Sequence, residues 1–274
     1  MPWIDSHCHL DAPELEPDIV SVRALARERG VTHCVIPAVD AHNLDAVRQL
    51  AHALGDSYAL GIHPLCSNDA TGDHLDRLAG QLQQHRDDPR LVAVGKIGLD
   101  YFVDNLDDQH QQHIYREQLK LAHEHGLPVI VHSRRSVDKV LKHLREIEVP
   151  GGIAHAFTGS LQQAESFLKL GFKLGFGGAS TFERATRLHG LLRELPLSAI
   201  VVETDSPDIP PHWVYRTAAE RQAGASQGRN TPAELPRIAE CIADVRGIDP
   251  QELAVAAMEN TMAALPGLRR ILDR

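Results

Sequence analysis

Short apolar or β-branched runs alternate with amphipathic segments along most of the 274-residue chain. Apolar runs bounded by turn residues are typical of buried strands, and apolar positions that recur every three or four residues are typical of helices. The pattern predicts strands at Trp3–His9, Thr32–Ala38, Tyr58–His63, Leu91–Ile97, Pro128–His132, Gly152–Phe157, Phe172–Phe176 and Ala199–Asp205. It predicts helices between them at Val20–Arg29, Leu44–Leu54, Leu75–His85, Gln109–His125, Val137–Glu148, Leu161–Leu170 and Ala185–Leu195.

This regular alternation predicts an α/β protein with a parallel (β/α)8 TIM barrel. A doubly wound open sheet is the rival fold, but no glycine-rich dinucleotide fingerprint follows the first strand, and the number of units matches barrel closure. The sequence has no internal repeat, low-complexity tract or linker, so we expect residues 1–274 to form a single domain. In such a barrel, functional side chains gather at the carboxyl ends of the strands.

The composition of the chain argues against several function classes. A formal net charge of −9 and an aromatic content of 4% do not suit a protein that coats nucleic acid through a basic or stacking surface. No apolar run approaches the roughly 20 residues that cross a bilayer, and no secretory signal is visible, so we expect no membrane association. Four cysteines without a CxxC pair are typical of free thiols in a reducing cytoplasm. No obligate protein partner is inferred.

Side chains that can bind metal recur where the predicted strands end. His7 and His9 close the first strand, and because side chains alternate along a strand, we expect both imidazoles on one side. Asp205 closes the last strand. Intervening strands carry His63, Lys96, His132 and His155 at or near their ends. Because these ends meet at one mouth of a barrel, the residues predict a centre for one or two divalent metal ions.

Six motifs at these strand ends form a joint pattern. They are Asp5-x-His7-x-His9-Leu10-Asp11, Gly61-Ile62-His63-Pro64, Gly98-Leu99-Asp100-Tyr101, His132-Ser133-Arg134, the run from His155 to Ser160, and Glu203-Thr204-Asp205-Ser206-Pro207. Taken jointly, they resemble the TatD family, the deoxyribonuclease-like branch of the amidohydrolase superfamily. The stretch Leu161–Glu165 is most similar to the YjjV-like group of that family. The resemblance extends to Asn230-Thr231-Pro232 and so covers nearly the whole chain.

The resemblance implies a (β/α)8 barrel with one or two divalent ions, and the donor types leave Zn2+, Mn2+, Mg2+, Fe2+ and Ni2+ open as the metal. It implies metal binding by His7, His9, His132, His155 and Asp205. It also implies that Glu203 supports the catalytic Asp205. The residues implied around the substrate pocket are His63, Arg134, Arg229 and Asn230.

Position 96 departs from the family pattern Gly-Glu-x-Gly-Leu-Asp, in which the glutamate bridges two metal ions. Lys96 reverses that charge, and two like unit charges about 4 Å apart cost roughly 4 kcal/mol at an effective dielectric of 20. Three outcomes are open. Lys96 stays charged, pairs with Asp205 or with a substrate phosphate, and replaces one metal ion. Alternatively it is carboxylated and becomes a metal ligand, as a strand-four lysine is in other members of the superfamily, or the substitution disables the enzyme.

The leading functional hypothesis is metal-assisted hydrolysis of a phosphodiester at a nucleic-acid end or in a small phosphoester. In this hypothesis Asp205 is the general base, and Arg134 and His63 hold the phosphate. The same activated water could attack a carbonyl group, so an aminoacyl-tRNA ester, a lactone or another carboxylic ester or amide stays open as the substrate. The third reading is an impaired or non-catalytic homologue, because Lys96 replaces the bridging glutamate.

Overall fold

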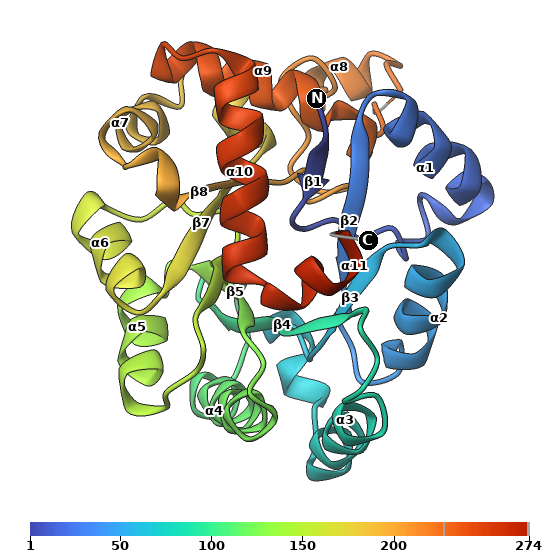
Figure 1. The fold of residues 1–274 in the computed structure, drawn as a ribbon, viewed down its shortest axis with the longest axis vertical. Coiled ribbons are helices and arrows are strands. Elements are labelled where there is room, and N and C mark those ends of the chain that lie inside the picture. The colour runs from blue at the N-terminus through green and yellow to red at the C-terminus, as the bar shows by residue number, and fades with distance from the viewer. Residues whose placement is uncertain (227, 273–274) are drawn as a thin grey trace.

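The computed structural model describes residues 1–226 and 228–272. Within these ranges, eight parallel strands follow one another in the order β1 to β8 and curl into a barrel with helices on its outside (Figure 1). The strands are β1 (Trp3–Asp5), β2 (Val31–Pro37), β3 (Ser57–Leu60), β4 (Leu91–Asp100), β5 (Val129–Arg134), β6 (Gly152–Ala154), β7 (Phe172–Phe176) and β8 (Ile200–Val202). The predicted (β/α)8 architecture is confirmed.

One α-helix follows each of the first seven strands. These helices are α1 (Ile19–Glu28), α2 (Leu44–Leu54), α3 (Gly72–Gln84), α4 (Asp108–His125), α5 (Val137–Glu146), α6 (Leu161–Lys169) and α7 (Thr186–Glu194). After β8 come α8 (Ala218–Gln222), α9 (Leu235–Arg246), α10 (Pro250–Ala264) and α11 (Arg269–Leu272). In the described part of the chain, no helix combines the length and the apolar character that a membrane crossing requires.

Several strands are shorter than the sequence pattern predicted. β1 ends at Asp5, β3 at Leu60, β6 at Ala154 and β8 at Val202. After β1 the backbone keeps single hydrogen bonds to both neighbouring strands: the Ser6 N–H donates to the carbonyl of Val202 on β8, and the Cys8 N–H donates to the carbonyl of Val35 on β2, each at 3.2 Å. His7 and His9 lie beyond the end of β1. Their Nε2 atoms are 3.2 Å apart, so the two imidazoles do face one side, although both residues lie outside the strand that was predicted to contain them.

The seam between β8 and β1 is held by side chains at the mouth of the barrel. The two carboxylate oxygens of Asp5 accept hydrogen bonds from the backbone N–H and the hydroxyl of Thr204, at 3.0 and 2.5 Å. Burial raises the pKa of Asp5 to about 7. Next to this contact, the Asp205 N–H donates to the carbonyl of His7 at 2.9 Å. The seam thus fixes Asp205 beside His7.

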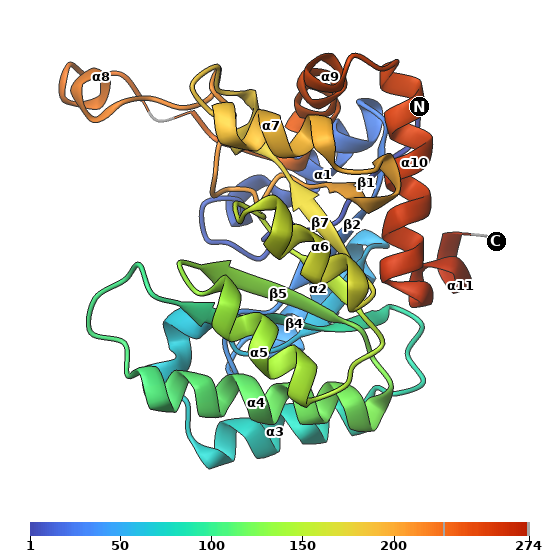
Figure 2. The same ribbon diagram turned by 90° about the vertical axis from the view of Figure 1, so that its left-hand side faces the viewer.

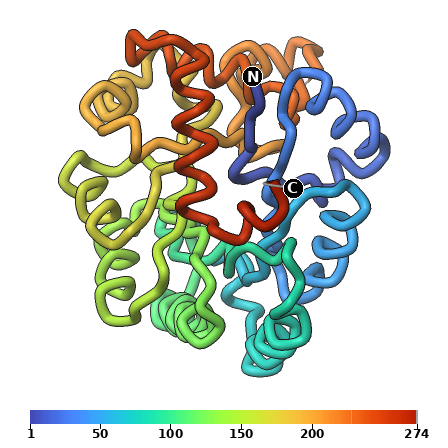
Figure 3. Tube along the Cα trace, viewed as in Figure 1, coloured from blue at the N-terminus to red at the C-terminus, as the bar shows by residue number. Residues whose placement is uncertain are grey.

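The amino-terminal end of the barrel is covered by α10 and α11. Figures 2 and 3 show α10 running across this end, on the same side as both chain termini, whereas α8 projects from the opposite end. Met262, Leu265 and Leu268 pack in one apolar cluster with inward-facing strand residues such as Ile4 and Val92. The barrel is therefore plugged at one end, and its strands end in the open mouth at the other.

A buried charged cluster anchors α1 to the outside of the barrel. The guanidinium of Arg23 donates to both carboxylate oxygens of Asp56, at 2.6 and 2.7 Å. Asp56 also accepts the Cys34 N–H at 3.0 Å. His33 is 2% exposed, and its Nε2 lies 2.8 Å from the Ser57 hydroxyl. Burial lowers the pKa of His33 to about 4.

Candidate active site

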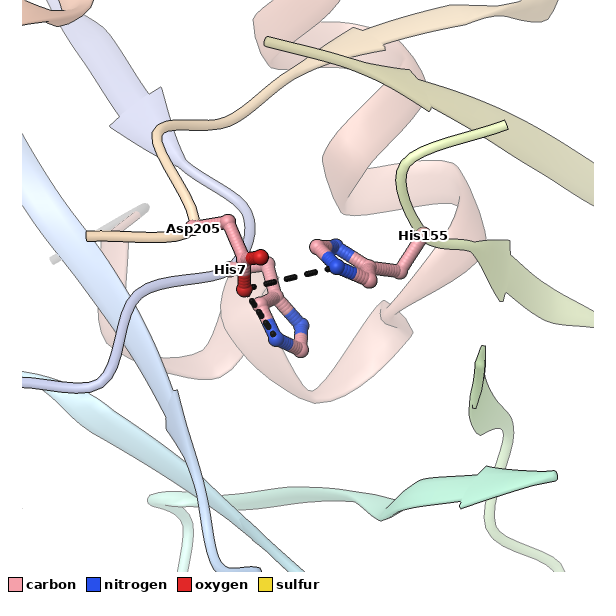
Figure 4. Close-up of side chains that lie close together, drawn as sticks. All are labelled: His7, His155 and Asp205. Atoms are coloured by element: carbon pink, nitrogen blue, oxygen red, sulfur yellow. Dashed lines mark ion pairs between the residues drawn. The ribbon is translucent and has the colours of Figure 1, made fainter. Parts of the chain in front are cut away.

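Four side chains, from β4 and from the segments that follow β1 and β6, converge on one oxygen, Oδ1 of Asp205. The distances to this oxygen are 3.3 Å from Nε2 of His7, 3.5 Å from Nε2 of His9 and 3.3 Å from Nε2 of His155. Nζ of Lys96 lies 3.2 Å away. All five side chains are buried. Figure 4 shows His7 and His155 directed toward Asp205 from separate elements. The structure thus brings these predicted residues together at the mouth.

The donor atoms of this group suit a divalent cation. Nε2 of His7 and Nε2 of His9 lie only 3.2 Å apart, and the Nδ1 atoms of both rings are buried without a hydrogen-bond partner in the described part of the chain. Burial is the main reason that the pKa of His7 lies well below its ordinary value, so its ring is neutral and keeps a free lone pair. Donor atoms of His7, His155 and Asp205 lie within 4.8 Å of one another. Such imidazole and carboxylate donors fit a metal ion.

Glu203 lies behind His155 and orients its ring. A carboxylate oxygen of Glu203 is 2.8 Å from Nδ1 of His155 and accepts the Ala156 N–H at 2.6 Å. Burial opposes a charged imidazole, but the nearby Glu203 and Asp205 carboxylates outweigh this and raise the pKa of His155. Gly175 permits the approach, because a Cβ there would lie 2.3 Å from the Glu203 carboxylate. Glu203 therefore leaves Nε2 of His155 directed at Asp205.

His132 is held by a different carboxylate. Its Nε2 lies 2.9 Å from Oδ2 of Asp100, and its ring contacts the His63 ring edge-on with centroids 4.6 Å apart. Burial lowers the pKa of His132 to about 4. Burial, His132 and Lys96 together hold the pKa of His63 well below its ordinary value. Both rings are thus neutral, and His132 lies outside the group of close donor atoms formed by His7, His155 and Asp205.

Lys96 lies on β4 and is 5% exposed. Its ammonium donates to Asp205 across 3.2 Å. Burial alone would raise the pKa of Asp205, but Lys96 and then His155 outweigh burial and hold that pKa well below the ordinary value. Asp205 is therefore ionised, and its charge faces the ammonium group.

A cleft of about 470 Å3 opens above these residues. His63, Lys96, His132, Arg134, His155 and Asp205 all line it. The guanidinium carbon of Arg134 lies 3.6 Å from the centroid of the Phe102 ring. The cleft thus offers one exposed cation, Arg134, beside the buried group around Asp205.

Arg229 and Asn230 do not line this cleft. Both terminal nitrogens of Arg229 donate to the carboxylate of Asp18 at 2.6 Å. The amide of Asn230 donates to the backbone carbonyls of Thr204 and Asp208, at 2.9 and 2.7 Å. The structure therefore places Arg229 in a surface ion pair, and Asn230 behind the turn that carries Asp205.

Sequence reasoning missed two acidic residues that support the site. Asp100 holds His132, and Asp5 accepts the His7 N–H at 3.2 Å. Both residues lie within motifs that were singled out, Asp5-x-His7 and Gly98-Leu99-Asp100-Tyr101. For Asp5 the signal was its place two residues before His7, since carboxylates often support metal-binding histidines. Asp100 has no such signal, because its partner His132 lies on another strand.

Comparison with known proteins identifies the family. The model of a family described as TatD related DNase matches residues 4–266. The chain belongs to the TatD family. The uncharacterized metal-dependent hydrolase YjjV of Escherichia coli K12 is 39% identical over 264 residues, which cover 94% of this chain and 96% of YjjV. The predicted TatD resemblance and its YjjV-like character are therefore confirmed.

Two further comparisons, one with a solved structure and one with a human protein, show the range of the similarity. The crystal structure of YjjV matches with a TM-score of 0.88 at 36% identity and covers 96% of this chain and 98% of that one. Human deoxyribonuclease TATDN3 is 28% identical over 283 residues, covering 99% of this chain and 97% of its own. In each of the two comparisons the similarity covers at least 96% of both proteins.

Proposed function

We propose that this TatD-family chain hydrolyses phosphodiester bonds at nucleic-acid ends or in small phosphoesters, with one divalent metal ion. The proposal depends on one observation, the convergence of His7, His9 and His155 on the Asp205 carboxylate beneath an open cleft. The description of relatives as metal-dependent hydrolases supports the reaction class, and that of TATDN3 as a deoxyribonuclease supports the bond type.

His7, His9, His155 and Asp205 would hold the ion. When bound, a divalent ion would supply Lewis acidity there, which activates water for attack and polarises a phosphoryl oxygen. His132 was also expected to bind metal, but its Nε2 is engaged by Asp100 at 2.9 Å. That contact supports one ion over two. Nitrogen and oxygen donors leave Zn2+, Mn2+, Mg2+, Fe2+ and Ni2+ as candidates.

The chain's own residues supply proton transfer and phosphate binding. Asp205 is ionised, and it accepts the proton of the attacking water as general base. Glu203 keeps His155 oriented through its 2.8 Å contact with Nδ1. Arg134 holds the phosphate through two parallel N–H donors, and the neutral His63 imidazole adds one further hydrogen bond.

Lys96 replaces the second metal ion in this proposal. Its buried ammonium lies 3.2 Å from Asp205 and pairs with that carboxylate until substrate phosphate arrives. A further cation about 4 Å from the ammonium would cost roughly 4 kcal/mol per unit charge at an effective dielectric of 20. A charged Lys96 accounts for the 3.2 Å contact with Asp205, so this proposal takes the charged form in place of the carboxylated form.

A substrate panel tests this function. Purified protein is assayed with bis(p-nitrophenyl) phosphate, short oligonucleotides and p-nitrophenyl carboxylic esters, in the presence of Mg2+, Mn2+ or Zn2+. We expect turnover of the phosphodiesters that EDTA abolishes and that added metal restores. Hydrolysis of the carboxylic esters alone would contradict the proposal and favour a carbonyl substrate. No turnover of any substrate would instead indicate an impaired homologue.

A further inference from the structure

A second hollow adjoins the catalytic cleft. It has a volume of about 560 Å3 and lies between the first turn of α5 and the loop that precedes α6. Ser133 and Thr158 line both this hollow and the cleft. A ligand bound at Asp205 can therefore continue into the neighbouring space, which we call the side groove.

The walls of the side groove are basic. Arg135, Lys139 and Arg187 line it together with one acidic residue, Asp138. Lys139 is neutralised by Asp108, whose carboxylate lies 2.9 Å from its ammonium. Arg135 and Arg187 are exposed, and the guanidinium group of neither makes a hydrogen bond or ion pair with any residue in the described ranges. Because the whole chain carries a net charge of −9, this positive charge is a local feature.

Phe102 contacts one arginine from each of the two hollows. The guanidinium carbons of Arg134 and Arg135 lie 3.6 and 4.6 Å from the centroid of its ring, which is 46% exposed as a residue. Arg135 has a φ of 57°, in the left-handed region that few non-glycine residues adopt. Arg134 lines the cleft and Arg135 lines the side groove. Two successive arginines thus contact the same aromatic ring, and cation–π attraction holds both guanidinium groups against it. One of them lines the cleft and the other lines the side groove.

We infer that the side groove binds the sugar–phosphate backbone of a nucleic-acid strand beyond the bond that is cleaved. Arg135 and Arg187 contact phosphates other than the scissile one. This inference rests on the proposed function and narrows its substrate to strands of several nucleotides. Each of the two hollows falls in the roughly 300–1,000 Å3 range of small-ligand sites, so together they have room for more than one nucleotide. Unpaired guanidinium groups suit phosphate because they can donate two parallel hydrogen bonds.

Strand-length dependence of binding tests the side groove. Thymidine oligonucleotides with phosphorothioate linkages keep their negative charge and resist hydrolysis, so fluorescence anisotropy with the purified protein measures binding alone. We expect a tetranucleotide to bind at least about tenfold more tightly than a dinucleotide, because its additional phosphates gain charge-assisted hydrogen bonds. A tetranucleotide with neutral methylphosphonates at its outer linkages should bind no better than the dinucleotide.

A double variant assigns that length dependence to the side groove. Arg135→Gln with Arg187→Gln should reduce the tetranucleotide preference to about twofold or less. The slope of log affinity against log salt should become shallower by about 1.4, since each phosphate contact to a single strand contributes about 0.7. The matched control, Arg86→Gln with Arg145→Gln, removes two exposed arginines near the carboxyl ends of α3 and α5, at the plugged end of the barrel. It should keep the preference.

Two results would overturn the inference. One is equal affinity of the wild-type protein for the two lengths. The other is an unchanged preference in a double variant whose melting temperature matches that of the wild type. Hydrolysis of bis(p-nitrophenyl) phosphate, which has no second phosphate, tests the proposed reaction separately. A protein that fails to hydrolyse it but keeps the length-dependent binding would refute the reaction and retain the side groove as a strand-binding site.

Discussion

The ammonium of Lys96 and the carboxylate of Asp205 are 3.2 Å apart and almost completely buried. Three imidazoles approach the same carboxylate oxygen to within 3.5 Å. Removing one partner of a buried ion pair is costly because it leaves the other charge without compensation. Lys96 is therefore integrated into the electrostatics of the TatD-type site, and its substitution should change more than turnover.

Lys96→Glu should raise the metal content from about one ion per chain to about two. The new carboxylate removes a like charge and restores the bridging ligand of the family pattern. Elemental analysis of the purified proteins measures the content, and Lys96→Met is the control that removes the charge without adding a ligand. Two ions per wild-type chain, or an intact mass showing a carboxylated lysine, would contradict the role proposed for Lys96.

Arg134→Lys should raise KM for bis(p-nitrophenyl) phosphate and lower kcat/KM by about tenfold. Lysine keeps the charge but loses the planar fork that donates two parallel hydrogen bonds to phosphate and packs on Phe102. Steady-state kinetics measure the effect. Arg145→Lys, on an exposed site of α5, is the matched control and should behave as the wild type. Wild-type kinetics in Arg134→Lys would exclude Arg134 from phosphate binding.

Asp56→Asn should reduce the free energy of unfolding by about 3–5 kcal/mol, because it leaves the Arg23 guanidinium buried without its carboxylate partner. Urea unfolding followed by circular dichroism measures the loss. Asp18→Asn breaks the exposed pair with Arg229 and should cost far less. Since Asp56 lies outside the cleft lining, metal content should stay unchanged in both variants. A similar loss in the two variants would show that burial is not decisive here.

Stability should fall as the pH drops from about 6.5 toward 4, with a contribution from His33. Burial lowers the pKa of this residue from 6.5 to about 4, so between these values the unfolded chain binds a proton that the folded chain excludes. Such a group contributes at most about 1.4 kcal/mol per pH unit. Urea unfolding at several pH values should therefore give a flatter profile for His33→Gln. If the stability of His33→Gln and of the wild type changed with pH in the same way, His33 would not contribute to the loss of stability in acid.

The main elements of the barrel could be predicted because each has a clear period. Leu44–Leu54 and Phe172–Phe176 match α2 and β7 residue for residue. The α10 plug was not predicted. Buried residues of α10 lie on several sides of the helix, among them Leu253, Ala254 and Thr261. Its sequence therefore lacks the separate apolar and polar faces by which an amphipathic helix is predicted.

Which residues meet at the site could be predicted more easily than which side chains contact one another there. Parallel strands bring their carboxyl ends together, which is why His7, His155 and Asp205 meet. The engagement of His132 by Asp100 depends on strand register, in which Gly98 pairs with His132. A single sequence contains the motifs on β4 and β5 but not the offset between them, so this partner emerged only from the structure.

Because α10 and α11 cover the amino-terminal end of the barrel, the site can be reached only from the carboxyl-terminal end of the strands in the described part of the chain. A molecule that reaches Lys96 enters and leaves through the same open mouth of the barrel. For the reaction proposed above, substrate and product would therefore share one route, and a bound product would have to leave before the next substrate enters.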